Sequence, residues 1–278
     1  MKLDTPEKYL SRYEYIETQL CWGDGITAGE LAKTFYISRQ AAQKVIDDYR
    51  RLHPGQMEYN RYLKRHVATG SFEPVFIRDN PLFFLDYLRG QSLAGYYRLE
   101  QDWSDLEVTD IDRLLKPSLK SEPIKTVLSA LRRQKVVNID YRKKDSEFDS
   151  ITARAISPNH LVFADSRYHI RAYCHLRNYF LDFVLSRILY AEISEDIEWV
   201  SSRDDNGWKE SVSLYFKPNP ELHESVQEAI LRNYENADEP EFRVIKCKKS
   251  LSFYIERKLC ETDDPKYKMP LWIIVKSE

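Results

Sequence analysis

The segment TAGELAKTFYISRQAAQKVIDDYRR, residues 27–51, decides the fold of the N-terminal third of the chain. Thr27 stands three residues before Glu30, the capping-box spacing in which the two side chains satisfy free amides at the start of a helix. A short helix is therefore predicted over residues 28–35. Two connecting residues follow, after which Ser38 can cap a second helix.

The second helix has one apolar and one polar face, because Ala42, Val45, Ile46 and Tyr49 recur at helical spacing. A bracing helix followed by a capped helix with a polar outer face is typical of a helix-turn-helix, whose second helix enters the major groove of DNA. Arg and Lys can pair with guanine, and Gln can make two hydrogen bonds to adenine. We expect base contacts from the leading end of this helix, at Arg39, Gln40, Gln43 and Lys44.

The flanking segments predict a winged helix. Residues 6–20 carry apolar side chains on one helical face, and residues 57–67 have the β-branched and aromatic content of a hairpin with a basic tip. Between Arg39 and Arg65, seven basic residues stand against three acidic ones. The predicted DNA-binding set is completed by Thr27, Ser38, Arg61, Lys64 and Arg65.

The composition limits the remaining classes. A chain of 278 residues indicates two or three domains, and its net charge of −2 makes the local basic patch the relevant quantity. The first residues lack the apolar core of a signal peptide and no apolar run is long enough to cross a bilayer, so a cytoplasmic protein is expected. The four cysteines lie far apart, which predicts neither a disulfide framework nor a metal site.

In the middle of the chain the spacing of apolar residues changes from helical to alternating. Helices are expected over residues 82–89 and 121–133, with an irregular bridge over 90–117. Four short alternating strands follow, over residues 137–141, 150–156, 167–173 and 180–188, and they suggest a small, strongly bent sheet or barrel. On the third strand His169, Arg171 and Tyr173 share one face, which is therefore cationic and aromatic.

Three runs in this region resemble the WYL domain, an Sm-like small barrel found behind winged helices in bacterial regulators. They are ISPNHLVF (156–163), SRYHIRAYC (166–174) and LDFVLSRI (181–188). The namesake triplet is altered to Tyr168-His169-Ile170, a form similar to the BrxR and CapW-like repressors of phage-defence islands. The resemblance covers the whole chain and implies a homodimeric repressor that acts on an inverted-repeat operator of double-stranded DNA.

The resemblance also implies a pocket that senses a nucleotide or nucleic-acid effector. Guanidinium groups can hold phosphate in bidentate fashion, and aromatic rings can stack on bases. The predicted ligand-binding residues are Tyr141, His160, His169, Arg171, Tyr173, Phe183 and Arg187. No catalytic residue, metal or cofactor is predicted, because the chemistry is recognition.

The C-terminal segment is expected to be a βαββ-like module with strands near 208–216 and 241–246, helices near 220–234 and 251–259, and an interior apolar strand over 271–275. The predicted fold class is α+β with several domains. They are a winged helix-turn-helix domain (1–78), a helical linker (79–120), an Sm-like β-barrel WYL sensor domain (121–200) and a small αβ dimerisation domain (201–278).

Two other classes of function stay open. An enzyme would use His160, His169, Cys174 and His175 as metal ligands or as a Cys–His pair, but zinc sites usually show tighter paired spacing. A transcriptional activator, or an accessory protein that binds RNA or single strands through the WYL domain, would keep the same binding chemistry.

Overall fold

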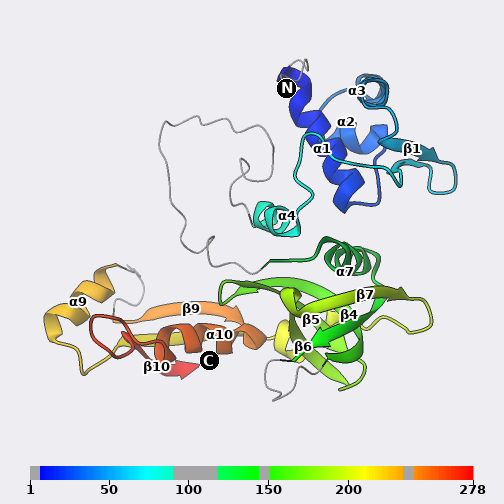
Figure 1. The fold of residues 1–278 in the computed structure, drawn as a ribbon. Coiled ribbons are helices and arrows are strands. Elements are labelled where there is room, and N and C mark those ends of the chain that lie inside the picture. Colours follow the sequence, from blue (N-terminus) through cyan, green and yellow to red (C-terminus); the bar gives the residue numbers. More distant parts are fainter. Residues whose placement is uncertain (1–6, 90–117, 144–150, 234–240, 278) are drawn as a thin grey trace.

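The computed structural model describes residues 7–89, 118–143, 151–233 and 241–277, and Figure 1 shows three connected parts. An N-terminal group of helices with a hairpin is followed by a bent sheet with a covering helix and then by a smaller C-terminal sheet. The bridge predicted over residues 90–117 lies outside the described residues.

The N-terminal part is a helical bundle with a hairpin, as the sequence predicts. Its elements are α1 (Glu7–Trp22), α2 (Ala28–Phe35), α3 (Arg39–Leu52), β1 (Met57–Asn60) and β2 (Arg65–Ala68). The apolar faces of the three helices meet in one core, since burial of such faces is what stabilises short helices. Its fully buried side chains include Tyr13, Ile16, Leu31, Ile46 and Tyr49.

A buried carboxylate ties the chain after the hairpin to α1. Glu17 is fully buried and accepts a hydrogen bond from the Tyr49 hydroxyl at 2.9 Å. It also accepts from the backbone N–H groups of Val75 (2.8 Å), Phe76 (2.6 Å) and Ile77 (3.1 Å). Burial raises the pKa of Glu17, although these four hydrogen bonds oppose the change. This network fixes the exit of the hairpin against α1 and α3.

The connection between α1 and α2, which pairs with the hairpin, needs a glycine at one position. Ile26 pairs with His66 of β2 in an antiparallel bridge, and Gly25 before it has a φ of +98°. A Cβ on Gly25 would lie 2.1 Å from the His66 carbonyl oxygen. Only glycine combines the positive φ with so close an approach of two backbones.

Helix α4 (Pro81–Leu88) joins the N-terminal part to the central sheet. Asn80 caps it by accepting from the Leu82 N–H at 2.9 Å. The buried Tyr168 hydroxyl of the sheet donates to Asp86 of α4, and the Arg89 guanidinium lies 3.4 Å from the centre of the Phe163 ring. The tyrosine of the altered triplet therefore faces α4.

The central part is a five-stranded antiparallel sheet covered by α7 (Ser121–Arg133), which packs on β7, β4 and β3. Its strands are β3 (Val136–Arg142), β4 (Ile151–Ala164), β5 (Arg167–Cys174), β6 (Tyr179–Val184) and β7 (Ile188–Ser194). Pro158 lies inside β4, where the register with β5 shifts between Pro158 and His160. A proline cannot donate to the ladder, so it is tolerated at such a bulge.

The sheet has one strand more than the sequence predicted and is not a closed barrel. Residues 185–187 form a 3-10 turn that separates β6 from β7, where a single strand was expected over 180–188. The strand order is β6-β5-β4-β3-β7, and within the described residues no pairing joins β6 to β7. The Sm-like barrel expected from the resemblance is therefore an open, bent sheet here.

The C-terminal part is a three-stranded antiparallel sheet with helices. It comprises η2 (Ser202–Asp204), α8 (Asn206–Lys209), β8 (Ser211–Pro218), α9 (Glu224–Arg232), β9 (Arg243–Lys248), η3 (Lys249–Leu251), α10 (Ser252–Glu256), η4 (Arg257–Glu261, π-helical) and β10 (Trp272–Ser277). Trp208 lies in α8 instead of the predicted strand, because Asp205 accepts from its N–H and starts a helical turn. Strand β10 was expected inside a sheet but forms an edge in the order β10-β8-β9.

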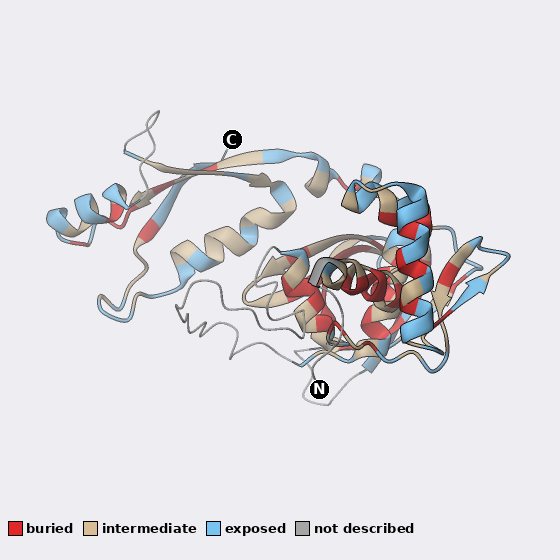
Figure 2. Cartoon of the chain, turned by 90° about the horizontal axis from the view of Figure 1, so that it is seen from above, coloured by how far each residue is buried: buried red, intermediate tan, exposed pale blue. Residues whose placement is uncertain are grey.

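One hydrophobic core crosses the boundary between the first two parts. Trp22 and Ile77 of the N-terminal part belong to the same buried cluster as Phe84 of α4, Leu128 of α7 and Ile170 of β5. In Figure 2 buried positions concentrate in the N-terminal and central parts, whereas the C-terminal part is mostly half-buried or exposed. Among the described residues, the buried side chains of the C-terminal core are Leu214, Phe216, Leu222, Ile230 and Trp272.

Candidate nucleic-acid interface and candidate ligand site

The leading end of α3 presents the predicted base-reading side chains to solvent. Arg39, Gln40, Gln43 and Lys44 are all exposed, while Ala42, Val45, Ile46 and Tyr49 are buried on the opposite face. The Gln43 amide donates to Asp47 Oδ1 at 3.1 Å. The helix therefore presents cations and amides in an arrangement suited to the major groove.

Two predicted DNA contacts serve as helix caps. Thr27 Oγ1 accepts from the Glu30 N–H at 3.2 Å, and the Glu30 carboxylate accepts from the Thr27 N–H at 2.8 Å, which completes the predicted capping box. Ser38 Oγ accepts from the Ala41 N–H at 3.1 Å and caps α3. Both side chains hold the two helices of the motif in place through these caps.

The tip of the hairpin is basic and exposed. Arg61 and Lys64 lie in the turn between β1 and β2, where the Asn60 side chain accepts from the N–H groups of Tyr62 and Leu63. This short-range capping shapes the turn locally. The tip therefore offers two cations to a phosphate backbone.

Arg65 differs from the other predicted cations because it is paired within the chain. It forms an ion pair with Glu30, which links β2 to α2. Burial alone would raise the pKa of Glu30, but hydrogen bonds from Arg65 and Thr27 outweigh burial and hold it below its usual value. Arg65 therefore positions the hairpin against the helix-turn-helix.

Two tyrosines that sequence reasoning missed are the most exposed aromatic side chains of this surface. Tyr36, in the turn between α2 and α3, is 97% exposed, and Tyr62, at the hairpin tip, is 94% exposed. A tyrosine hydroxyl can donate to a phosphate oxygen. The available signal was an aromatic residue at the centre of a predicted turn, where no core position requires one.

The residues predicted for the ligand site separate into three groups. Tyr141 and Phe183 belong to the apolar core, where their rings meet edge to face at 5.2 Å. Tyr173 contacts His175 and Phe180 near the end of β5, and Arg187 lies half-buried in the turn before β7. His160, His169 and Arg171 all face the C-terminal part of the same chain.

Arg171 is the centre of a buried charge cluster, which we call the latch and define as Arg171, Asp182, Asp205 and Tyr254. Arg171 donates from Nε and Nη2 to the two oxygens of Asp205, at 2.5 and 3.0 Å, and from Nη1 to Asp182 at 3.0 Å. The Tyr254 hydroxyl donates to the other oxygen of Asp182 at 2.9 Å. The latch thus joins the central sheet to α8 and α10.

The charges of the latch change the electrostatics expected from the sequence. Burial opposes the charge on Arg171, but Asp205 and Asp182 outweigh it and raise the pKa of the guanidinium above its usual value. Burial, together with the negative charge on Asp182, raises the pKa of the Tyr254 hydroxyl. Two carboxylates face one guanidinium, so carboxylates of the same chain more than balance the positive charge of Arg171, and this face is not openly cationic.

Two histidines pack beside the latch. The His160 ring stacks on Trp208 at 4.0 Å with an interplanar angle of 12°, and the His169 ring lies 5.5 Å from that of Tyr254. Burial lowers the pKa of both histidines, so they are neutral near pH 7. His160 Nε2 and Ser250 Oγ are buried without a hydrogen-bond partner in the described part of the chain.

The residues considered for an enzyme do not form one site. Cys174 is buried and accepts from Arg154 at 3.6 Å, while His175 shares a hydrogen bond with Ser157 at 2.9 Å. Over residues 7–89, 118–143, 151–233 and 241–277, no group of three or more His, Cys, Asp or Glu side chains has a metal-binding arrangement. In the same residues no helix combines the length and apolar character needed to cross a membrane.

Comparison with known proteins identifies two domains. The family model of the BrxR transcriptional regulator winged helix-turn-helix domain matches residues 8–90, and that of the WYL domain matches residues 122–193. Both matches fall where the structure has the helix-turn-helix with its hairpin and the five-stranded sheet.

Three curated relatives have the same printed name, DNA-binding transcriptional repressor CapW. The protein of Escherichia coli strain KTE188 is 26% identical over 261 residues, which cover 93% of this chain and 85% of that protein. The protein of Stenotrophomonas maltophilia is 26% identical over 89% of this chain and 82% of its own length. The protein of Pseudomonas aeruginosa is 28% identical over 88% of this chain and 80% of its own length. These relatives are regulators and not enzymes, in agreement with the sequence-based prediction.

Among the solved structures that match is the proteasome accessory factor B/C (PafBC) of Arthrobacter aurescens. It is 16% identical over 98% of this chain, which spans 46% of the length of that protein, with a TM-score of 0.27.

Proposed function

We propose that this chain, which belongs to the BrxR- and CapW-like WYL-domain regulators, is a homodimeric DNA-binding transcriptional repressor. It binds an inverted-repeat operator, controls a phage-defence operon, and is released by a nucleotide or oligonucleotide that binds the WYL domain. The observation that carries the DNA-binding step is the exposed leading end of α3 with the basic hairpin tip on the same domain.

The exposed residues are expected to have two different roles in DNA binding, base reading and phosphate neutralisation. Gln40 and Gln43 can read base edges, whereas Lys44, Arg61 and Lys64 can neutralise phosphates. Gln43→Ala should therefore weaken binding to the operator more than to unrelated duplex. Lys44→Ala should weaken both and reduce the salt dependence by about one ion, because each neutralised phosphate releases roughly one counterion.

The test is an electrophoretic mobility shift with duplex from upstream of the gene's own operon, titrated with salt. Lys266→Ala is the matched control, because it removes an exposed positive charge from the C-terminal part. Operator binding that survives both α3 variants would contradict the interface. A preference for single strands over duplex at low salt would favour an RNA- or single-strand-binding protein.

Dimerisation is proposed for the C-terminal part. Strand β10 is an edge with exposed apolar side chains, because Ile273 is 36%, Ile274 38% and Val275 50% exposed. Such an edge is a template for pairing with another strand unless it is covered. We expect sedimentation velocity to show a dimer in the parent and a monomer in Ile274→Lys; a monomeric parent would contradict the proposal.

Release by an effector rests on the latch. An oligonucleotide phosphate can replace the carboxylates around Arg171 because guanidinium binds phosphate in bidentate fashion. The orphaned His160 Nε2 and Ser250 Oγ lie at the same junction and offer it further hydrogen bonds, since a Cβ on Gly207 would lie 3.2 Å from Ser250 Cβ and 3.3 Å from Arg171 Nη2. The effector then loosens the C-terminal part and shifts the dimer away from the operator-binding geometry.

A fluorescein-labelled oligothymidylate is the probe for this step. Anisotropy should report saturable binding, and the unlabelled probe should release operator duplex in the mobility-shift assay. Release that is unchanged in an Arg171→Ala, Arg187→Ala double variant would contradict the assignment of the WYL face, whatever the outcome for α3.

A further inference from the structure

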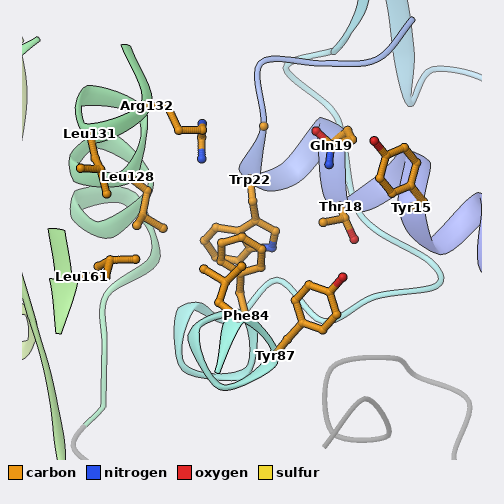
Figure 3. A pocket seen from close by; sticks show the side chains of 12 residues that line it. Tyr15, Thr18, Gln19, Trp22, Phe84, Tyr87, Leu128, Leu131, Arg132 and Leu161 are labelled. Atoms are coloured by element: carbon orange, nitrogen blue, oxygen red, sulfur yellow. The ribbon is translucent and has the colours of Figure 1, made fainter. Parts of the chain in front are cut away.

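A cavity of about 410 Å³ lies between the winged helix and the WYL domain, and none of its lining residues belongs to either proposed nucleic-acid site. Figure 3 shows side chains from the end of α1, from α4, from α7 and from β4 around one space. Its volume lies in the range of pockets that hold small molecules, which is about 300 to 1,000 Å³. Residues from both domains line it, so an occupant would contact both.

The walls are apolar and partly flat. Trp22 of α1 and Phe84 of α4 stack with ring centres 4.7 Å apart and an interplanar angle of 4°. Three leucines of the WYL domain, Leu128 and Leu131 of α7 and Leu161 of β4, add aliphatic lining, and Leu88 of α4 also lines the cavity. Flat aromatic walls with aliphatic sides favour a planar, largely apolar molecule.

A buried hydrogen-bond donor belongs to this lining. Trp22 is only 3% exposed, and its Nε1 has no hydrogen-bond partner in the described part of the chain. In Figure 3 this nitrogen lies on the side of the ring that faces Thr18 and Tyr87. Because burying a hydrogen-bond donor without an acceptor destabilises the protein, an acceptor on a bound molecule would be favoured there.

A cation lies at the mouth of the cavity. Arg132, in the last turn of α7, is exposed and lines the pocket, and Figure 3 shows it extending toward the end of α1. Burial lowers the pKa of Arg132 and the charge of Asp24 opposes this change, but no ion pair joins Arg132 to a described residue. A carboxylate on the bound molecule would complement this guanidinium.

We propose that this cavity is a second ligand site, which binds a small planar aromatic carboxylate. The ring lies among Trp22, Phe84 and the three leucines, an acceptor atom takes the Trp22 N–H, and the carboxylate points to Arg132. The site goes beyond the proposed function because its occupancy requires neither operator nor oligonucleotide. By contacting α1 and α7 together, the ligand also fixes the winged helix relative to the sheet.

The test uses 1-naphthoate as the probe and the full chain labelled with ¹⁵N. The sequence has five tryptophans, so the indole N–H region of a ¹H–¹⁵N spectrum contains few signals, and Trp22→Phe identifies the one of interest. Millimolar 1-naphthoate should shift the Trp22 signal in a saturable way. No shift of this signal would overturn the proposal.

Three variants define the site. Leu131→Phe narrows the cavity and should abolish the shift, while the other indole signals report that the fold is retained. Arg132→Ala should weaken binding about two- to fivefold, as expected for an exposed charge pair, and Arg133→Ala, its neighbour, should not. Equal weakening by both arginine variants, or an undiminished shift in Leu131→Phe, would refute the assignment.

Discussion

Removal of the Arg171 guanidinium should destabilise the protein far more than loss of an exposed ion pair nearby. The Arg171 side chain is 9% exposed and those of Asp205 and Asp182 are 4% and 12% exposed, so Arg171→Ala leaves two carboxylates buried without their cation. Breaking a buried pair in this way costs about 3–5 kcal/mol. Asp205→Asn keeps the shape of the side chain and should cost less, about 1.5–3 kcal/mol.

Urea denaturation followed by circular dichroism measures these changes in the free energy of unfolding. The matched control is Lys249→Ala, which breaks an exposed ion pair of 2.7 Å with Glu210 in the same region and should cost less than about 1 kcal/mol. In a double-mutant cycle Arg171→Ala and Asp205→Asn should be non-additive by at least about 1 kcal/mol. A cost for Arg171→Ala equal to that of the control would refute the view that the latch holds the C-terminal part.

Two further changes test the winged helix. Gly25→Ala places a Cβ 2.1 Å from the His66 carbonyl oxygen at a φ of +98°. It should lower the melting temperature and reduce the free energy of unfolding by at least about 1–3 kcal/mol. The control is Gly70→Ala, which has no atom within 4 Å of the new Cβ and should be near neutral. Burial and the charge of Glu17 raise the pKa of Glu14 from 4.5 to about 7 in the folded protein. The unfolded chain therefore loses this proton at lower pH than the folded protein does. As a result, the contribution of Glu14 to the free energy of unfolding falls as pH rises between those two values. Thermal denaturation across that range should therefore show a larger loss in the parent than in Glu14→Gln; parallel pH profiles would count against this origin.

The N-terminal part could be predicted from the sequence because its signals are local. The capping box of Thr27 and Glu30, the Ser38 cap and the spacing of Ala42, Val45, Ile46 and Tyr49 act within a few residues of one another. Such signals specify helices wherever the chain places them. The exposed positions on α3 follow directly, because the apolar face fixes the polar one.

For the predicted ligand-binding residues of β5, the sequence could indicate which side chains share a face of the strand but not which residues they contact. Alternation placed His169 and Arg171 on one side of β5, and the structure agrees. Their partners Asp205 and Tyr254 are 34 and 83 residues from Arg171, and no local pattern predicts pairing at such separation. The expected cationic pocket is instead a junction in which Arg171 is paired with two carboxylates, and these carboxylates come from other elements.

The latch also predicts how tightly an effector binds. If an oligonucleotide must displace Asp205 from Arg171, the fraction of molecules with an open latch limits its apparent affinity. Asp205→Asn weakens the closed state, so oligothymidylate should bind more tightly, by about tenfold for each 1.4 kcal/mol removed. Asp204→Asn is the matched control, because it removes the same charge from an exposed neighbour and isolates the general attraction of a polyanion.

Operator binding should change in the opposite direction. By linkage, a change that favours the open latch disfavours the operator-binding form, so Asp205→Asn should weaken operator binding while Asp204→Asn leaves it near the parent value. Fluorescence anisotropy with labelled oligothymidylate and with labelled operator measures both effects on the same protein. Equal oligothymidylate affinity in the two variants would show that the effector does not compete with Asp205, and that Arg171 serves stability alone.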